Sequence, residues 1–330
     1  MKYIIGAYAA SPSTRGENAT DEERFYSEVS ALPGFGGLEI AFDGSLHPFD
    51  EKWLLGRIKP NWKIVVTLIP GTVKRLAKSS EFGLASDSPA GRQSAIDFCE
   101  EARQAVIRIN NAAGAEVVAA VEVHSAPTRG SGDITTSGES FAKSLTALGS
   151  RDWSDAKLVV EHCDAFVSGQ VPAKGFLDLD AELEAVRIAL RDSPTEFGVS
   201  INWARSVIET RQVDGAVTHL KAARAAGLLA GVMFSSCATE PTAYGEPWTD
   251  AHLPPPRPDG VTGTAQYEAK ASMLTRDEVH RALNAVGPLD ALDFCGLKVS
   301  APRSLNPDVQ ERIAIVKDSL TELRAAGSRF

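Results

Sequence analysis

Carboxylates and histidines stand at the ends of apolar runs in the first half of the chain. Glu39 lies within LEIAF, and Glu122 and His124 lie two positions apart in VEVHS. Side chains two apart point to the same side of an extended strand. Glu161 and His162 directly follow the apolar run KLVV. Because positioned carboxylates give and take protons in many reactions, we predict that Glu161 and Glu122 are catalytic.

Cations and polar side chains end the apolar runs of the second half. Lys298 lies within GLKVS, and Arg205 follows SINWA. A lysine in an apolar strand must be paired or functional, because an unpaired buried charge is costly, and we predict that Lys298 is catalytic. Two cations facing one site would focus a positive potential that favours anionic or enolisable sugar-like ligands. The predicted substrate-binding residues, all at or beyond strand ends, are Glu39, His124, His162, Asn202, Trp203, Arg205, Ser235 and Glu240.

A purely structural role is the alternative for several of these residues. Glu39 would then pair with Lys63 or Arg205, and Glu161 would only anchor Lys298 as an ion pair. One of the two strand-end histidines would be a packing residue, because neighbouring positions in a strand face opposite ways. The histidines in predicted loops and on predicted helix surfaces, to which we assign no role, are His47, His219, His252 and His280.

The elements that carry these residues repeat as strand, loop and helix. Short apolar, often β-branched runs predict eight strands, at residues 3–9, 37–42, 63–69, 116–123, 157–161, 197–202, 229–234 and 294–299. Helical spacing and end signals predict helices between them, at residues 21–32, 94–113, 180–190, 214–226, 275–286 and 307–326.

Eight strand–helix units in 330 residues predict one (β/α)8 TIM barrel over residues 1–330. A doubly wound open sheet is the alternative, but it more often carries a glycine-rich phosphate turn, and the chain has neither GxGxxG nor GxxxxGK[ST]. Residues 240–272, which contain LPPPRPDGVTG, form a long loop after the seventh strand. Loops of this length are usually functional, so we expect either a substrate-covering loop or a surface excursion.

Composition excludes several classes of partner. With 34 Lys+Arg against 43 Asp+Glu, the net charge is −9, and no basic run offers a surface for nucleic acid or an anionic membrane. No apolar run approaches the roughly 20 residues that span a bilayer. The four cysteines form no CxxC pair, which indicates reduced thiols and a cytoplasmic protein. The predicted partner is a small carbohydrate or sugar acid, and a homo-oligomer is compatible with the sequence.

The chain resembles the xylose-isomerase-like TIM barrels of the sugar-phosphate isomerase/epimerase superfamily. The resemblance covers most of the length and rests on the opening strand, on GLEI, on VVEH and on the spacing of the eight units. The chain also resembles an uncharacterised bacterial family of similar size, in which we expect the INWARS and GLKVS segments. The resemblance implies the barrel fold and a sugar-like substrate.

The superfamily holds a divalent metal with acids and a histidine at the ends of strands five to eight. By this resemblance Glu161 fits the strand-five glutamate, whereas Asn202, Ser235 and Lys298 stand at the other three ligand positions. Hard divalent metals need several oxygen ligands, mostly charged, and a lysine would repel the ion. We therefore predict no resident metal and no other cofactor. A relocated divalent metal at Glu122, His124 and Glu161 is the alternative.

Four functions follow from these residues. The first is a metal-independent sugar or sugar-acid isomerase or epimerase, in which a lysine and an arginine replace the metal charge. The second is a glycoside hydrolase that pairs Glu122 with Glu161 or Glu240. The third is a Schiff-base lyase using Lys298, and the fourth is a sugar-binding protein without catalysis. We take the first as the main hypothesis.

Overall fold

Eight strands close into a barrel in chain order in the computed structural model, which describes residues 2–130 and 134–327. Neighbouring strands run parallel: β1 pairs with β2 and with β8, and β3, β4, β5 and β6 pair one after the other. The predicted (β/α)8 barrel is confirmed. The strands are β1 (Tyr3–Ile5), β2 (Phe35–Ala41), β3 (Lys63–Thr67), β4 (Val118–Val123), β5 (Lys157–His162), β6 (Phe197–Asn202), β7 (Leu229–Phe234) and β8 (Phe294–Leu297).

Three strands end at least two residues earlier than predicted. β3 stops at Thr67 instead of residue 69. β1 stops at Ile5, and the 3-10 helix η1 (Ala7–Ala9) follows it. β8 stops at Leu297, so Lys298 is the first residue beyond the strand rather than within it. Its backbone N–H still donates to the carbonyl of Phe234 at 2.8 Å. These strands are therefore shorter at their carboxyl ends than the apolar runs predicted, and the loops after them begin earlier in the chain.

The chain forms two compact units. The terminal unit contains the chain up to Glu39, Asn202–Lys221 and the chain from Val232 onward, and the central unit contains Ile40–Ile201 and Ala222–Gly231. That the whole chain acts as one domain remains a prediction.

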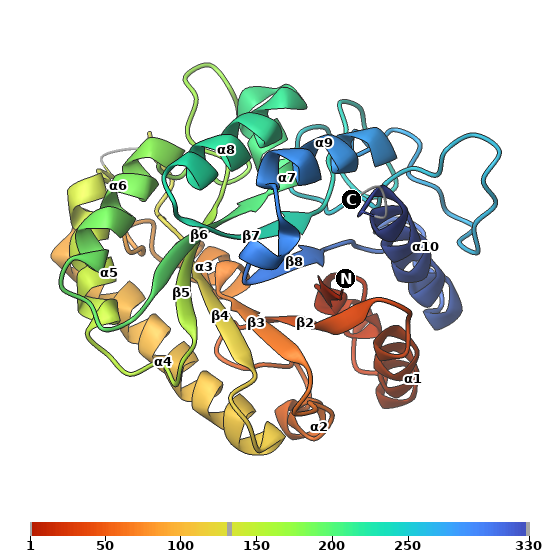
Figure 1. The fold of residues 1–330 in the computed structure, drawn as a ribbon, viewed down its shortest axis with the longest axis horizontal. Helices are drawn as coiled ribbons and strands as arrows, with labels where there is room; N and C mark the ends of the chain where they lie inside the picture. The colour runs from red at the N-terminus through yellow and green to blue at the C-terminus, as the bar shows by residue number, and fades with distance from the viewer. Residues whose placement is uncertain (1, 131–133, 328–330) are drawn as a thin grey trace. The chain divides into compact units, whose positions relative to one another are not determined.

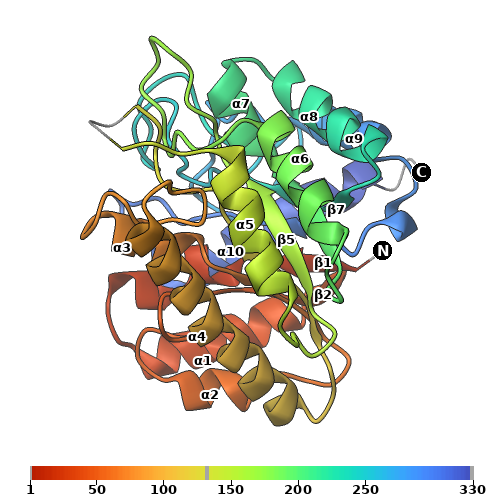
Figure 2. The same ribbon diagram turned by 90° about the vertical axis from the view of Figure 1, so that its left-hand side faces the viewer.

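In the central unit, helices pack around buried strands. α5 contacts both α4 and α6 (Figure 2), and the valines of β3, β4 and β5 form an apolar interior. α4 starts one turn before the predicted residue 94, because Ser88 caps its first turn by accepting from Gly91 N–H. The helices of this unit are α2 (Glu51–Leu55), α3 (Ile69–Leu76), α4 (Pro89–Ala113), α5 (Gly138–Gly149) and α6 (Leu179–Leu190).

In the terminal unit, α10 packs against α1 and α9 (Figure 1). α9 starts as predicted, with Thr275 accepting from the N–H of Glu278. The helices of this unit are α1 (Ala19–Ser30), the 3-10 helix η2 (Pro12–Arg15), α7 (Trp203–Thr210), the first part of α8 (Asp214–Ala225), α9 (Arg276–Val286), the 3-10 helix η3 (Leu289–Ala291) and α10 (Val309–Gly327). None of the described helices combines the length and the apolarity that crossing a membrane requires.

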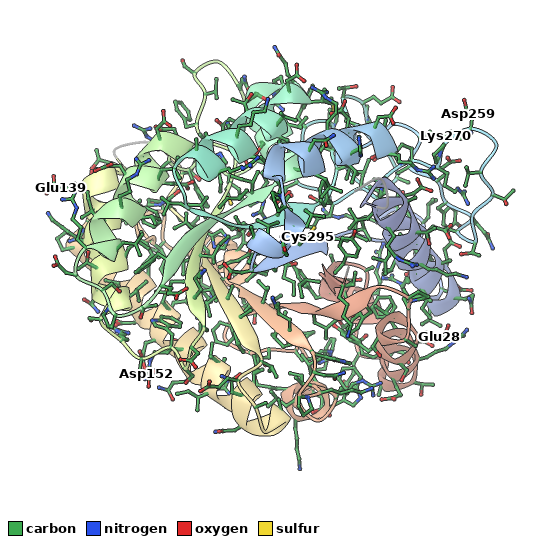
Figure 3. The ribbon with its side chains drawn as sticks, in the orientation of Figure 1. Glu28, Glu139, Asp152, Asp259, Lys270 and Cys295 are labelled. Carbon is green, nitrogen blue, oxygen red and sulfur yellow. The ribbon has the colours of Figure 1, made fainter. Side chains whose placement is uncertain are left out.

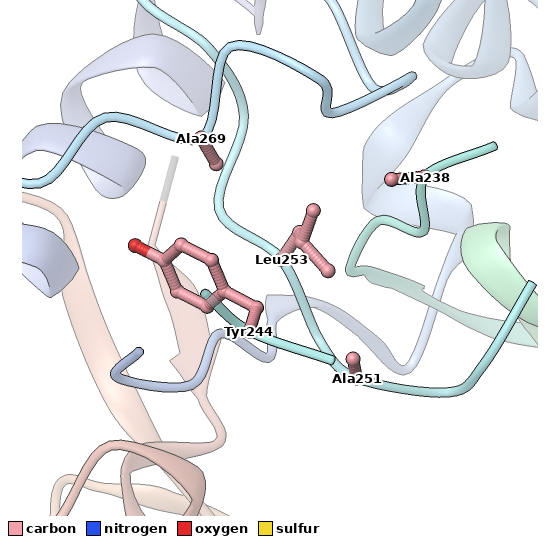
Figure 4. Packing of buried hydrophobic residues seen from close by; sticks show 5 residues of the cluster. All are labelled: Ala238, Tyr244, Ala251, Leu253 and Ala269. Carbon is pink, nitrogen blue, oxygen red and sulfur yellow. The ribbon is translucent and has the colours of Figure 1, made fainter. Parts of the chain in front are cut away.

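The predicted long loop after β7 is confirmed and runs from residue 235 to α9. Its middle is folded, because Ser236 and Leu253 exchange two backbone hydrogen bonds of 2.9 and 3.0 Å. Buried apolar side chains of the loop itself form a small cluster (Figure 4), made of Ala238, Tyr244, Ala251, Leu253 and Ala269. Asp259 and Lys270 of the same loop point outward and are exposed (Figure 3).

The loop is tied to the end of β8 and to α10. Ser300 N–H, just beyond β8, donates to the carbonyl of His252 at 2.8 Å. Two carboxylates of α10, Glu311 and Asp318, accept backbone N–H groups from residues 264–267. The loop therefore lies at the carboxyl ends of β7 and β8, the end at which TIM barrels carry their active sites.

Candidate active site

A buried carboxylate and imidazole meet at the ends of β4 and β5 in the central unit. Nε2 of His124 lies 2.9 Å from Oε2 of Glu161, and both side chains are fully enclosed. The register pairs Val123 with Val160, so the residues one step further come level. Thr67 at the end of β3 places its hydroxyl 3.5 Å from the same Glu161 oxygen. We refer to Thr67, Glu122, His124, Glu161 and Ser200 as the Glu161 group.

A second carboxylate belongs to this group. Glu122 Oε1 accepts a hydrogen bond of 2.8 Å from Ser200 Oγ of β6, and both side chains are buried. A carboxylate oxygen of Glu122 lies within 4.8 Å of one of Glu161. Buried carboxylates are costly unless polar partners compensate them, and the hydroxyl and the imidazole supply such partners. The two predicted catalytic glutamates therefore lie together.

His162 faces the other way, toward the helices. Its Nδ1 lies 2.7 Å from Oε2 of Glu182 on α6, and Ser125 donates to the other oxygen of Glu182. Alternation along β5 explains the difference, because Glu161 and His162 are neighbours and point to opposite faces. The structure thus brings His124, and not His162, to the carboxylate of Glu161.

A buried ion pair joins β2 to the residue after β8 in the terminal unit. Nζ of Lys298 lies 2.5 Å from Oε1 of Glu39, and neither side chain is exposed. Glu39 therefore takes part in a buried ion pair, as its structural alternative expected, and Lys298 is a cation of that pair, whereas Lys63 is exposed. The ring of Tyr8 lies 5.9 Å from the same ammonium group, within cation–π reach.

Arg205 belongs to α7 and not to a strand end. Its Nε donates to Oδ2 of Asp250 at 3.1 Å, and Oδ1 of Asp250 lies 3.1 Å from Nδ1 of His252. Burial lowers the pKa of His252, and the positive charges of Lys298 and Arg205 lower it further, while Asp250 raises it. We refer to Glu39, Arg205, Asp250, His252 and Lys298 as the Lys298 group.

This arrangement corrects the predicted positive potential. Each of the two cations faces a carboxylate, Glu39 for Lys298 and Asp250 for Arg205. The four formal charges sum to zero. These two cations therefore no longer support the prediction of an anionic ligand. Sequence reasoning missed Asp250 and gave His252 no role, because both lie in a loop whose residue types carry no periodic signal.

The residues at the superfamily metal positions of the terminal unit do not fit a divalent metal. Asn202 Oδ1 accepts from Ser235 Oγ at 2.8 Å, and the strand-eight position holds the ammonium group of Lys298. An amide oxygen, a hydroxyl and a cation are a poor donor set for a hard metal.

Two further predicted binding residues differ in exposure. Trp203 starts α7 and is fully buried, which leaves its ring enclosed by protein. Glu240 is exposed in the first part of the long loop. It is therefore available to solvent, in contrast to the buried Glu122 and Glu161.

Comparison with known proteins agrees with this fold. A protein of Salmonella typhimurium strain LT2 described as uncharacterized is 34% identical over 327 residues, which cover 99% of this chain and 98% of that protein. The solved structures that match include the zinc-containing IOLI protein, at 13% identity and a TM-score of 0.59, covering 100% of this chain and 99% of that one.

Two sugar epimerases also match. L-ribulose 3-epimerase has 14% identity and a TM-score of 0.56, covering 99% of this chain and 96% of its own. D-psicose 3-epimerase, solved with D-fructose, has 12% identity and a TM-score of 0.54, covering 99% of each chain. Identities this low show the fold alone, and they confirm the resemblance to xylose isomerase-like barrels. Residues 4–315 match the family described as "Domain of unknown function (DUF4862)", and the chain therefore belongs to the DUF4862 family.

Proposed function

We propose that this protein is a sugar or sugar-acid isomerase or epimerase that moves a proton on a carbon next to a carbonyl group. The observation that carries the proposal is the buried 2.9 Å contact between Glu161 and His124 at the carboxyl ends of β4 and β5. TIM barrels place catalytic residues at this end of their strands. The fold shared with sugar epimerases adds support.

In this proposal Glu161 is the base that removes the carbon-bound proton and returns it to the same or the neighbouring carbon. His124 holds Oε2 of Glu161 in place through its Nε2. Glu122, held by Ser200, is the second acid–base carboxylate. Negative charge develops on the substrate oxygen during this step and needs a positive group or a hydrogen-bond donor to stabilise it.

The test is proton exchange in D2O, followed by NMR, with D-fructose, D-psicose, L-ribulose and D-glucuronate as probes. The purified full chain should incorporate deuterium next to the carbonyl of at least one of them. Glu161→Gln should lower that rate by roughly 10²–10⁴, the usual contribution of a general base. No exchange with any probe would reject the proposed function.

A matched control is available in the same unit. Glu182 is also buried and also contacts a histidine, His162 at 2.7 Å, but it lies on α6. Glu182→Gln should therefore cost stability and leave the exchange rate nearly unchanged. Equal losses of exchange in Glu161→Gln and Glu182→Gln would show that disturbed packing, and not a lost base, explains the effect.

The absence of a resident metal is part of the proposal. Elemental analysis of the purified protein should find less than one metal ion per chain, and chelator treatment should leave exchange unchanged. A stoichiometric metal that disappears in both Glu122→Gln and Glu161→Gln would instead place a relocated metal site in the Glu161 group.

A glycoside hydrolase is the second candidate, favoured by one observation. One carboxylate oxygen of Glu122 lies no more than 4.8 Å from one of Glu161, so the two acids are near enough to act on one bond, as the paired carboxyl groups of retaining glycosidases do. Such an enzyme forms a covalent sugar ester, so 2-fluoro-glycosides should label Glu122 or Glu161. Hydrolysis of nitrophenyl glycosides together with such a label would replace the isomerase proposal.

A further inference from the structure

His252 lies where the long loop is attached to the rest of the terminal unit. Its carbonyl accepts from Ser300 N–H at 2.8 Å, and the carbonyl of Ala251 accepts from the Ser300 hydroxyl at 2.6 Å. On the other side, Leu253 pairs with Ser236 through two backbone hydrogen bonds. Ala251 and Leu253 also belong to the apolar cluster of the loop (Figure 4). A change at His252 therefore acts on the residues that fix the loop to the carboxyl ends of β7 and β8.

The imidazole of His252 is enclosed among charged groups. Only 13% of its side chain is exposed. Among the described residues, the charged groups that face it are Asp250 in the loop, Arg205 on α7 and Lys298 after β8, and Lys298 in turn contacts Glu39. These two cations and two carboxylates sum to zero charge while the ring is neutral. A proton on the ring would leave the Lys298 group with one excess positive charge, and an uncompensated buried charge is costly.

Asp250 does not remove this cost. Its Oδ2 accepts from Nε of Arg205 at 3.1 Å, and its Oδ1 lies 3.1 Å from Nδ1 of His252 without the geometry of a hydrogen bond. A protonated ring would therefore compete with Arg205 for a single carboxylate. Burial lowers the pKa of the imidazole and outweighs the opposite effect of Asp250, and the two cations lower the pKa further. The attached loop thus favours the neutral ring.

We propose that the long loop is an acid-sensitive cover, which is released from the carboxyl ends of β7 and β8 when His252 takes up a proton from water. The observation that carries the proposal is the position of an enclosed imidazole, flanked by two cations, at the attachment point of the loop. The proposal concerns the terminal unit alone and does not depend on the proposed enzymatic function.

The direction of the pH dependence follows from the two states of the loop. In the released loop the ring meets water, and its pKa is the ordinary value of about 6.5. In the attached loop the pKa is lower. Attachment is therefore fully favoured above about pH 6.5 and is weakened as the pH falls toward the lower pKa. Because one proton is involved, the ratio of released to attached loop should rise by up to about tenfold for each unit of pH.

Hydrogen exchange of the full chain, followed by mass spectrometry, measures this ratio without a substrate. The window runs from about pH 7.5 down to about pH 5, above the range in which most carboxylates titrate. After correction for the intrinsic pH dependence of exchange, peptides within residues 236–256 should lose protection as the pH falls. Peptides of α9 should show no such slope. Loop protection that is constant over the window, or that increases toward acid pH, would overturn the proposal.

His252→Asn tests whether the imidazole is the titrating group. The φ angle of His252 is +54°, and asparagine tolerates this left-handed backbone but carries no proton-binding ring. The acid-dependent loss of protection should disappear in His252→Asn and persist in His280→Gln on α9. A slope that persists in His252→Asn would assign the release to another group and reject the proposal.

A second measurement uses the unmutated protein and does not depend on the folding of that variant. Carbon-13 NMR of the histidine rings should show His252 neutral at pH 7, with a titration midpoint below about 6.5. The midpoint should coincide with the pH range in which the loop loses protection. A ring that titrates at or above about 6.5, or that titrates without any change in loop protection, would refute the role of His252.

Discussion

Removing the ammonium group of Lys298 should cost this protein a large part of its stability. Lys298→Met keeps the length of the side chain but leaves the carboxylate of Glu39, 1% exposed and 2.5 Å from the lost nitrogen, without that cation. Breaking a buried pair by removing one partner costs about 3–5 kcal/mol. Unfolding entropy of about 2.1 cal/mol/K per residue over 330 residues gives about 0.7 kcal/mol/K. The melting temperature should therefore fall by about 4–7 °C.

A double-mutant cycle separates the pair from the packing around it. Glu39→Leu should also destabilise the protein, whereas Glu39→Leu/Lys298→Met replaces both charges by apolar groups and should recover most of the loss. Thermal and urea unfolding, followed by circular dichroism and tryptophan fluorescence, measure all four proteins. The exposed pair Lys143–Glu139 on α5, treated in the same way, should show no measurable coupling, because solvent screens it.

One result would refute this reasoning. If the double variant is destabilised by the sum of the two single losses, the two residues do not compensate each other, and the stability of this region comes from packing alone. A Lys298→Met variant as stable as the unmutated protein would lead to the same conclusion from one measurement.

Three other predictions follow from the described contacts. Gly6→Ala would place a Cβ 2.5 Å from Oε2 of Glu39. The free energy of unfolding, measured with urea, should therefore fall by about 1–3 kcal/mol. An unchanged free energy of unfolding would mean that the ion pair of Glu39 and Lys298 moves aside without cost. The hydrogen bond from Arg103 is the main cause that lowers the pKa of Glu100 from 4.5 to about 2. The ionised Glu100 therefore stabilises the folded protein above pH 4.5, and this contribution is lost as the pH falls through about 2. In unfolding titrations Glu100→Gln should remove this pH dependence, which at such a surface site amounts to less than about 1 kcal/mol, and a persisting slope would assign it to other carboxylates. Asp318→Asn weakens the hold on residues 264–265 and should speed limited proteolysis within the long loop, so an unchanged cleavage pattern would show that the loop is held elsewhere.

The strands were predictable because buried parallel strands are continuous apolar runs. β6 and β7 match their predicted residues, whereas β1 ends early because the chain turns at Gly6 into a 3-10 helix. The sequence did not indicate α5, whose first residue is Gly138 and whose start depends on the cap Ser137. It also did not indicate α7, which begins directly after β6 without a loop.

Candidate residues at strand ends could be predicted from the sequence. Alternation along a strand gives the face on which a side chain lies, and the end of the apolar run gives its position along the strand. Glu122 and Glu161 on strands, and Lys298 directly after one, stand out against apolar neighbours, whereas their partners do not. Ser200 is one small polar residue among others, and no local pattern relates it to Glu122, 78 positions away. Asp250 lies in a loop, and only the folded backbone brings it to Arg205.

The way α10 holds the long loop has a consequence for how this family can diversify. Glu311 and Asp318 accept hydrogen bonds from the backbone N–H groups of residues 264–267. Every residue except proline offers the same N–H. Side chains in this stretch can therefore change between relatives, or in a designed library, while the path of the loop is kept.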